Sequence, residues 1–216
     1  MKRASKVPPE KRIGEILKRL KKAYPDAKCS LNYTNAFELL IATILSAQCT
    51  DERVNYVTRT LFQKYKTPED YLSVPEEELQ NDIRTTGFFR NKTRSIRGAS
   101  QRILDEFKGN VPSTMEELLT LPGVARKTGN VVMGNAYNIA SGVVVDTHVS
   151  RVSQRLKLTK QTIPEKIEID LMKLVPKKDW IKFSHMLILH GRAVCKAIKP
   201  DCPNCVLNDL CPSSTV

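Results

Sequence analysis

The chain has 216 residues, 41% of them hydrophobic and 27% charged, which is enough for a buried core without disulfide bonds. Its 35 lysines and arginines against 23 acidic residues give a net charge of +12. This excess favours a polyanionic partner such as nucleic acid over a chaperone role, with a basic solvated surface as the alternative. No run approaches the roughly 18 apolar residues of a membrane span. The first residues lack the apolar core of a secretory signal, so we expect an intracellular protein without a membrane partner.

Apolar residues spaced three and four apart predict a first helix that is amphipathic and basic. Its apolar face consists of Ile13, Ile16, Leu17, Leu20 and Tyr24. The remaining surface of this helix carries Lys11, Arg12, Lys18, Arg19, Lys21 and Lys22.

A helix bundle is predicted for the middle of the chain. Asn35 with Glu38 three residues later indicates a capped helix that opens the apolar stretch 37–47. Helical periodicity returns in 54–65 and 96–107. Breaks between the helices fall at Pro68, Pro75, Gly87, Gly109 and Pro112.

Only one segment, 142–145, has the composition of a strand. Four residues without a partner strand cannot form a sheet, so the predicted fold class is all-α.

Two short helices separated by a glycine turn are predicted for residues 113–137. Ser113 and Glu116 form a capping box for a helix through Leu121, and Leu121–Ala125 then turns into a second helix from Arg126 to about residue 137. Backbone N–H groups at such a turn suit a phosphate. The spacing fits a plain corner between two helices of a bundle equally well.

The six cysteines are distributed unevenly. Cys195, Cys202, Cys205 and Cys211 crowd the last 22 residues, where metal ligation explains them better than disulfides in an intracellular chain. The compact loop suits either tetrahedral zinc or a [4Fe–4S] cluster, and the spacing alone slightly favours zinc. Cys29 and Cys49 are expected to be free thiols, one of them on an apolar helix.

Four sequence segments carry a resemblance to the endonuclease III family. Leu121–Val132 resembles the family's helix-hairpin-helix, and the similarity extends to Leu45–Asp51, Val145–His148 and Leu187–Arg192. It covers nearly the whole chain beyond the first eight or so residues. The resemblance implies two helical domains flanking a DNA cleft.

The domain boundaries are expected near residues 28 and 140. Residues 29–140 would form a six-helix domain with the hairpin at about 113–137, while 1–28 and 141–216 would form an iron-sulfur cluster domain. The x6-x2-x5 spacing of the four cysteines matches the family's [4Fe–4S] cluster. The resemblance therefore favours this cofactor over zinc.

The resemblance also implies an activity. Such proteins are bifunctional DNA N-glycosylases and abasic-site lyases of base excision repair, which act on duplex DNA containing oxidised or saturated pyrimidines or abasic sites. We expect a monomer from the cytoplasm or nucleoid of a prokaryote.

Lys127 stands at the position of the family's nucleophilic lysine, and Asp146 at that of the aspartate that assists it. Burial, the neighbouring cation Arg126 and the positive end of a helix would favour the unprotonated amine. The alternatives are a solvated surface lysine and, for Asp146, a simple helix N-cap. An ionised cap is compatible with stabilising positive charge on the sugar.

DNA contacts are implied for a further set of residues: Gln48, Phe88, Gly123, Val124, Ala125, Arg126, His148 and Lys199. Gln48 resembles the residue that fills the gap left by a flipped nucleotide. Two positions depart from the family pattern. Ala125 replaces a glycine of the hairpin, and Phe88 replaces a leucine resembling a DNA wedge, which affects how the opposite strand is read.

Two rival functions remain at this stage. Monofunctional adenine or mismatch-thymine glycosylases lack a lysine at the position of Lys127, and the adenine enzymes use a glutamate near Ala42. The second rival is a non-catalytic, metal-stapled DNA-binding module in which Lys127 contacts phosphate. No histidine is needed as a metal ligand, so His185 and His190 are expected to serve packing.

Overall fold

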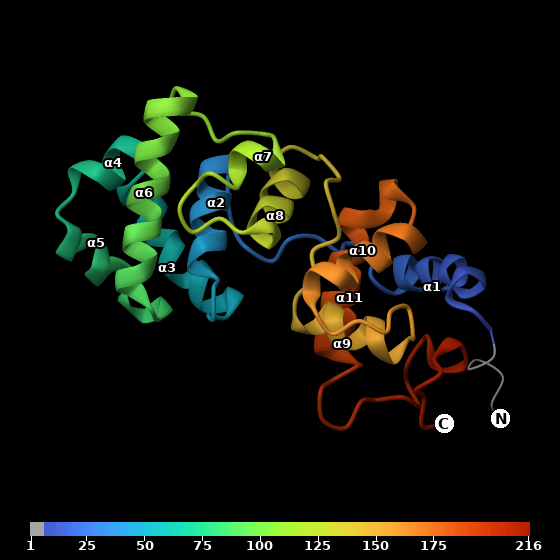
Figure 1. Ribbon diagram of the computed structural model, residues 1–216. Coiled ribbons are helices and arrows are strands. Elements are labelled where there is room, and N and C mark those ends of the chain that lie inside the picture. Colours follow the sequence, from blue (N-terminus) through green and yellow to red (C-terminus); the bar gives the residue numbers. More distant parts are fainter. Residues whose placement is uncertain (1–6) are drawn as a thin grey trace. The chain divides into compact units, whose positions relative to one another are not determined.

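The structure is a computed structural model that describes residues 7–216, and this range contains helices and no strand (Figure 1). The all-α fold class is thereby confirmed. No helix in the described range combines the length and the apolar character needed to cross a membrane. The expected absence of a secretory signal concerns the start of the chain, of which the first six residues lie outside this range. The chain forms two compact units, one from Cys29 to Ser141 and the other from the segment up to Lys28 with Gly142–Val216.

The unit Cys29–Ser141 contains seven α-helices, all within the described range. They are α2 (Ala36–Leu45), α3 (Asp51–Lys64), α4 (Pro68–Ser73), α5 (Glu76–Ile83), α6 (Phe89–Phe107), α7 (Met115–Leu118) and α8 (Arg126–Ala136), with a 3-10 turn η2 (Arg84–Thr86) before α6. Helix α2 is buried along most of its length, and α3, α6 and α8 pack around it. A predominantly apolar helix thus forms the centre of this unit.

Two helix N-termini in this unit test the capping predictions. The Asn35 side chain accepts a hydrogen bond from the Glu38 N–H at 2.9 Å, as expected for α2. The box predicted at Ser113 is wrong by one residue, since Thr114 caps α7 through the Glu117 N–H. Thr114 and Glu117 also hydrogen-bond through their side chains at 2.6 Å. Two adjacent hydroxyl residues followed by two adjacent glutamates allow both registers in the sequence, and burial of Leu118 accompanies the observed one.

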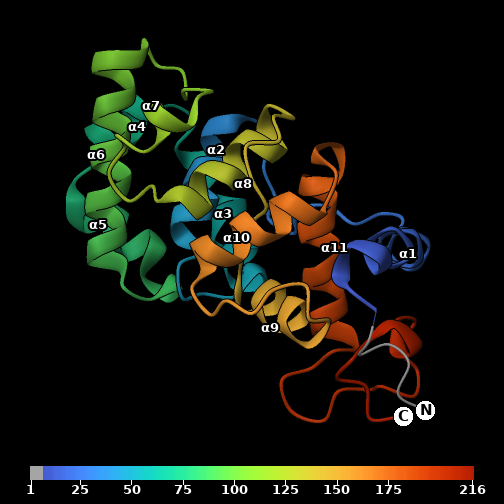
Figure 2. The same cartoon turned by 45° about the vertical axis from the view of Figure 1, so that its right-hand side comes forward.

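The second unit contains α1 (Pro9–Ala23), α9 (Thr147–Arg155), α10 (Pro164–Leu174) and α11 (Trp180–Ala193), with the 3-10 turns η3 (Lys177–Asp179) and η4 (Asn208–Leu210). Helices α9 and α11 lie side by side in both views (Figures 1 and 2). They approach closely at Gly191, where an added Cβ would lie 2.9 Å from the His148 Cβ. The buried segment Val143–Val145 precedes α9 and is not assigned to a strand.

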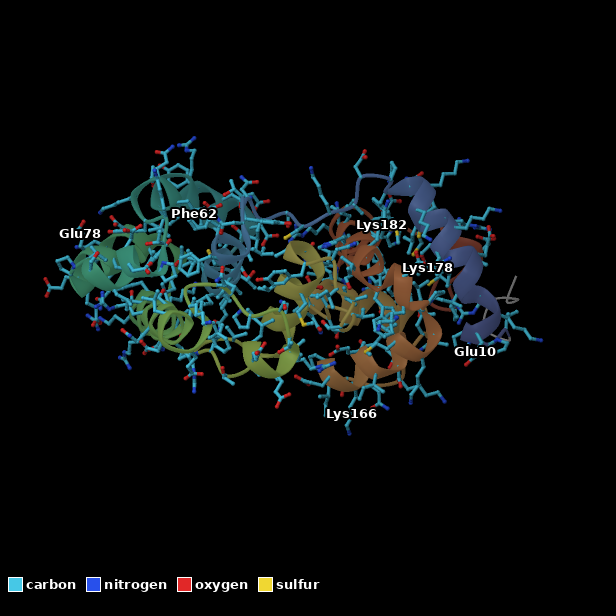
Figure 3. All side chains as sticks on the ribbon, turned by 90° about the horizontal axis from the view of Figure 1, so that it is seen from above. Glu10, Phe62, Glu78, Lys166, Lys178 and Lys182 are labelled. Carbon is cyan, nitrogen blue, oxygen red and sulfur yellow. The ribbon has the colours of Figure 1, made fainter. Side chains whose placement is uncertain are left out.

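Helix α1 has the predicted apolar face, but its cations are not all solvated. Arg12 is buried, and its guanidinium donates to the carbonyls of Leu156 and Leu210 at 2.9 Å each. Burial lowers the pKa of Arg12. A second contact involves Lys182, which Figure 3 labels. The Lys182 ammonium donates a hydrogen bond to the Pro25 carbonyl, just beyond the end of α1. These contacts attach α1 to the C-terminal part of the chain.

Candidate active site and cysteine pocket

The turn between α7 and α8 is built around Gly123. This residue has φ of +78°, and a Cβ there would lie 2.5 Å from the Ser95 Cβ on α6. Both the left-handed backbone and the lack of space therefore require glycine. Val124 is buried, and its N–H donates to the Leu121 carbonyl at 3.1 Å, so the turn is fixed from inside as well.

The N-terminus of α8 follows this turn directly. Ala125 is the N-cap residue, is exposed, and within the described residues receives no side-chain cap. The first N–H groups of a helix have no intrahelical acceptor, and they carry the positive end of the dipole. The turn and the first turn of α8 are therefore suited to an anion such as phosphate.

Lys127 is the second residue of α8 and is exposed, while Arg126 beside it is half-buried. The burial expected for Lys127 is therefore not present. An exposed amine is also accessible to a substrate.

Asp146 lies in the other unit and is the N-cap of α9. Its carboxylate accepts a hydrogen bond from the Val149 N–H at 2.8 Å, so the sequence-based N-cap interpretation is confirmed. The side chain is half-buried, whereas the preceding Val143–Val145 segment is buried. The buried segment and the cap together fix where the carboxylate stands.

Gln48 and Phe88 share an unusual backbone conformation. Gln48 follows α2 with φ of 53°, and Phe88 precedes α6 with φ of 49°. A left-handed conformation costs a non-glycine residue about 1–2 kcal/mol. Both side chains are nevertheless exposed, with Phe88 62% accessible. Cys49, adjacent to Gln48, lies in the same turn, and Cys29 lies in a loop. The prediction that one of these two thiols lies on an apolar helix is therefore wrong.

Cys195, Cys202, Cys205 and Cys211 line a single pocket. Arg155 donates to the Cys195 Sγ at 3.3 Å, and the Leu207 N–H donates to the Cys205 Sγ at 3.4 Å. All four thiols are free in the structure. Four sulfurs around one pocket, two of them accepting N–H hydrogen bonds, match the donor set of a thiolate-bound metal group. Within residues 7–216, no three histidine, cysteine or acidic side chains converge as ligands of one metal ion would.

Burial governs the ionisable groups around this pocket. It raises the pKa of the Cys205 and Cys211 thiols, and the neighbouring cysteines add to that effect. It also lowers the pKa of His190 to about 4. His190 is 2% exposed, with its Nε2 3.5 Å from the Cys205 Sγ and its Nδ1 3.0 Å from the Tyr24 hydroxyl. His185 is also buried, so both histidines lie in the interior, as a packing role requires.

Two arginines of α9 that the sequence did not single out hold the chain after Cys195. Arg151 donates to the Cys195 carbonyl at 3.1 Å, and Arg155 donates to the Lys196 and Ala197 carbonyls at 2.6 and 2.9 Å. The spacing of these arginines on one helix face was the available signal. Lys199 follows in this loop, exposed with φ of 52°. His148 is half-buried, and its Nδ1 lies 3.1 Å from the Arg151 guanidinium.

Comparison with known proteins defines the class of the chain. Residues 41–177 match the HhH-GPD superfamily of base excision DNA repair proteins. The chain is 58% identical over 205 residues to endonuclease III of Synechocystis sp., covering 95% of this chain and 94% of the relative. It is 49% identical over 203 residues to the Bacillus subtilis endonuclease III, covering 93% and 92%. The chain therefore belongs to the endonuclease III family.

Solved structures agree with this membership. A non-covalent endonuclease III–DNA complex matches with a TM-score of 0.91 and 46% identity, covering 96% of this chain and 97% of that chain. A trapped endonuclease III–DNA covalent intermediate matches with the same values.

Proposed function

We propose that this member of the endonuclease III family is a bifunctional DNA glycosylase and abasic-site lyase, which removes oxidised or saturated pyrimidines from duplex DNA and cleaves the strand 3′ to the site. The observation that supports this most is the exposed Lys127 in the first turn of α8, directly behind a glycine turn suited to phosphate. The architecture thus offers an amine beside a backbone-binding surface.

Lys127 is the proposed nucleophile. Its unprotonated Nζ attacks the sugar C1′, the N-glycosyl bond breaks, and the base leaves with the bonding electron pair and takes up a proton. Opening of the sugar ring gives a protonated Schiff base between Nζ and C1′. This iminium acidifies the 2′ hydrogen, so loss of a 2′ proton expels the 3′ phosphate by β-elimination. Water then releases the lysine.

Asp146 is the proposed electrostatic partner of this step. Its side chain accepts a hydrogen bond from the Val149 N–H at the N-terminus of α9, which holds the carboxylate in place. A fixed carboxylate stabilises positive charge that develops on the sugar as the base departs. The same carboxylate would therefore serve both capping and catalysis.

The target nucleotide must leave the base stack, because C1′ is shielded in a stacked duplex. We propose that Gln48 fills the resulting gap and that Phe88 enters the opposite strand as a wedge. Exposure of both side chains, held on left-handed residues, supports these roles. The larger ring of Phe88 would alter how the opposite base is read.

The proposed phosphate contacts come from the hairpin and two further segments. Gly123, Val124, Ala125 and Arg126 offer backbone N–H groups and one cation at the start of α8. His148 in the first turn of α9 and the exposed Lys199 would contact the DNA backbone as well.

We further propose that the four cysteines of the pocket hold a [4Fe–4S] cluster. Their donor set and the N–H hydrogen bonds to Cys195 and Cys205 fit such a group. The cluster would supply four iron–thiolate bonds that cross-link the C-terminal segment. Arg151 and Arg155 fix the loop between the first two ligands, and this loop presents Lys199.

Metal analysis tests the cofactor. Protein purified without oxygen should be yellow-brown and contain about four iron and four sulfide per chain, as expected for one [4Fe–4S] cluster. Elemental analysis and absorption spectra measure this directly. Stoichiometric zinc in a colourless anaerobic preparation would instead identify a zinc site.

Salt titrations test the phosphate contacts. With about 4–6 contacts, log K for duplex binding should fall against log salt with a slope of roughly −4 to −5. Lys199→Ala should reduce that slope by about one unit. Lys18→Ala is the matched control, because Lys18 is 80% exposed and pairs with Glu15 at 3.8 Å. An unchanged slope for Lys199→Ala would exclude this lysine from the binding surface.

Duplexes with single defined lesions test the activity. Oxidised and saturated pyrimidines should be excised and the strand cut to β-elimination products, whereas normal pyrimidines should remain. Product analysis on denaturing gels separates intact, abasic and cleaved strands. Excision that leaves the abasic strand uncut would indicate a monofunctional glycosylase, and binding without either reaction would indicate a non-catalytic module.

A further inference from the structure

Lys92 is a buried lysine on α6 that belongs to none of the sites described above. Lys92 is 4% exposed, and its ammonium donates hydrogen bonds to the carbonyls of Leu45 at 2.7 Å and Thr86 at 2.8 Å. Burial lowers its pKa, while the nearby Cys49 acts in the opposite direction. A buried cation is costly unless it is well hydrogen-bonded, so these two bonds account for its presence.

The two acceptors have related positions. Leu45 is the last residue of α2, and Thr86 is the last residue of η2. Carbonyls at helix C-termini have no intrahelical donor and carry the negative end of the helix dipole, which suits an ammonium group. One side chain therefore links the ends of two helices that are far apart in the sequence.

Both helix ends lead directly into the exposed left-handed residues. Gln48 follows Leu45 by three residues, and Phe88 follows Thr86 by two. The Lys92 N–H also donates to the Phe88 carbonyl at 3.1 Å. The same residue thus contacts Phe88 through its backbone and, through its side chain, the two helix ends that lead into the Gln48 and Phe88 turns.

We propose that Lys92 is a positioning residue for opening the duplex: its ammonium holds the Gln48 turn and the Phe88 turn at one separation, so that both side chains enter the base stack together. This inference rests on the roles proposed above for Gln48 and Phe88. A lysine that served only to satisfy buried carbonyls would stabilise the unit without coupling the two side chains.

The first test compares an abasic duplex with the same abasic strand alone, which needs no opening. Lys92→Met should lower kcat on the duplex by about a hundredfold, with a smaller change in KM. On the single strand, kcat should fall by about tenfold or less. Lys66→Met is the matched control, since it removes one exposed cation from the same unit and should leave the ratio of the two rates unchanged. Equal losses on both substrates would mean a general structural defect and overturn the proposal.

The second test measures coupling between Gln48 and Phe88. A 2-aminopurine beside the abasic site reports unstacking through its fluorescence. Gln48→Ala and Phe88→Ala should each reduce this signal. When Lys92 is present, the effect of the double substitution should differ from the sum of the two single effects. In the Lys92→Met background, the two effects should simply add. Persistent coupling in Lys92→Met would overturn the role of Lys92.

Failure of the underlying function has a different signature. If neither alanine variant changes the fluorescence or the duplex rate in the Lys92 protein, the filler and wedge roles are wrong whatever Lys92 does. Should Lys92→Met not fold, Lys92→Gln carries the same comparison, because its neutral and shorter side chain also removes the charged link between the two carbonyls.

Discussion

Lys127→Gln is expected to abolish both base excision and strand cleavage, with a loss on the order of 10⁴-fold or more. Glutamine lacks a nucleophilic amine and cannot form a Schiff base. Duplex affinity should change by less than about tenfold, because the hairpin backbone rather than the lysine amine would hold phosphate. Single-turnover cleavage assays and binding titrations measure the two effects separately.

A matched control for this substitution is Lys66→Gln, which removes an exposed lysine from the same unit away from the hairpin. It should retain full activity. Excision or cleavage by Lys127→Gln at near wild-type rates would rule out Lys127 as the nucleophile, and loss of duplex binding would assign it a phosphate contact instead.

Asp146→Asn is expected to slow excision by about 10³-fold while the protein remains folded. Asparagine is as good an N-cap as aspartate, so the bond to the Val149 N–H can be kept and the free energy of unfolding should fall by no more than about 1 kcal/mol. Thermal unfolding and single-turnover excision give the two quantities.

Asp146→Ala provides the comparison, since it removes the cap and the charge together. It should be as slow as Asp146→Asn and less stable by about 1 kcal/mol. Wild-type excision per folded molecule by Asp146→Asn, with loss of stability confined to Asp146→Ala, would show that Asp146 only caps α9 and that excision does not use its charge.

Local sequence signals predicted much of the helical framework. The cap at Asn35 could be predicted because it depends on neighbours within three residues. The same holds for the glycine turn before α8 and for the cap at Asp146. The register error at Ser113 arose where the same local signal occurs twice in succession. Burial of Leu118 accompanies the observed register, and burial depends on residues distant in the sequence.

Contacts between distant segments could not be predicted from the sequence. Arg12 was predicted on the basic surface of the first helix, yet carbonyls 144 and 198 residues away accept its hydrogen bonds. Lys92 and Arg155 likewise acquire their roles from carbonyls on other elements. For Lys127 the sequence left both a buried and a solvated side chain open, since a motif gives a residue's place on a helix but not what covers it.

Borohydride trapping on a duplex with one abasic site tests the central claim most directly, because reduction turns a Schiff base into a permanent covalent bond. The wild-type protein should form a protein–DNA adduct in one-to-one ratio, and peptide mapping should place the DNA on Lys127. Lys127→Gln should form none under the same conditions. An adduct on another residue, or no adduct from an active wild-type preparation, would contradict the assignment of Lys127 as the nucleophile.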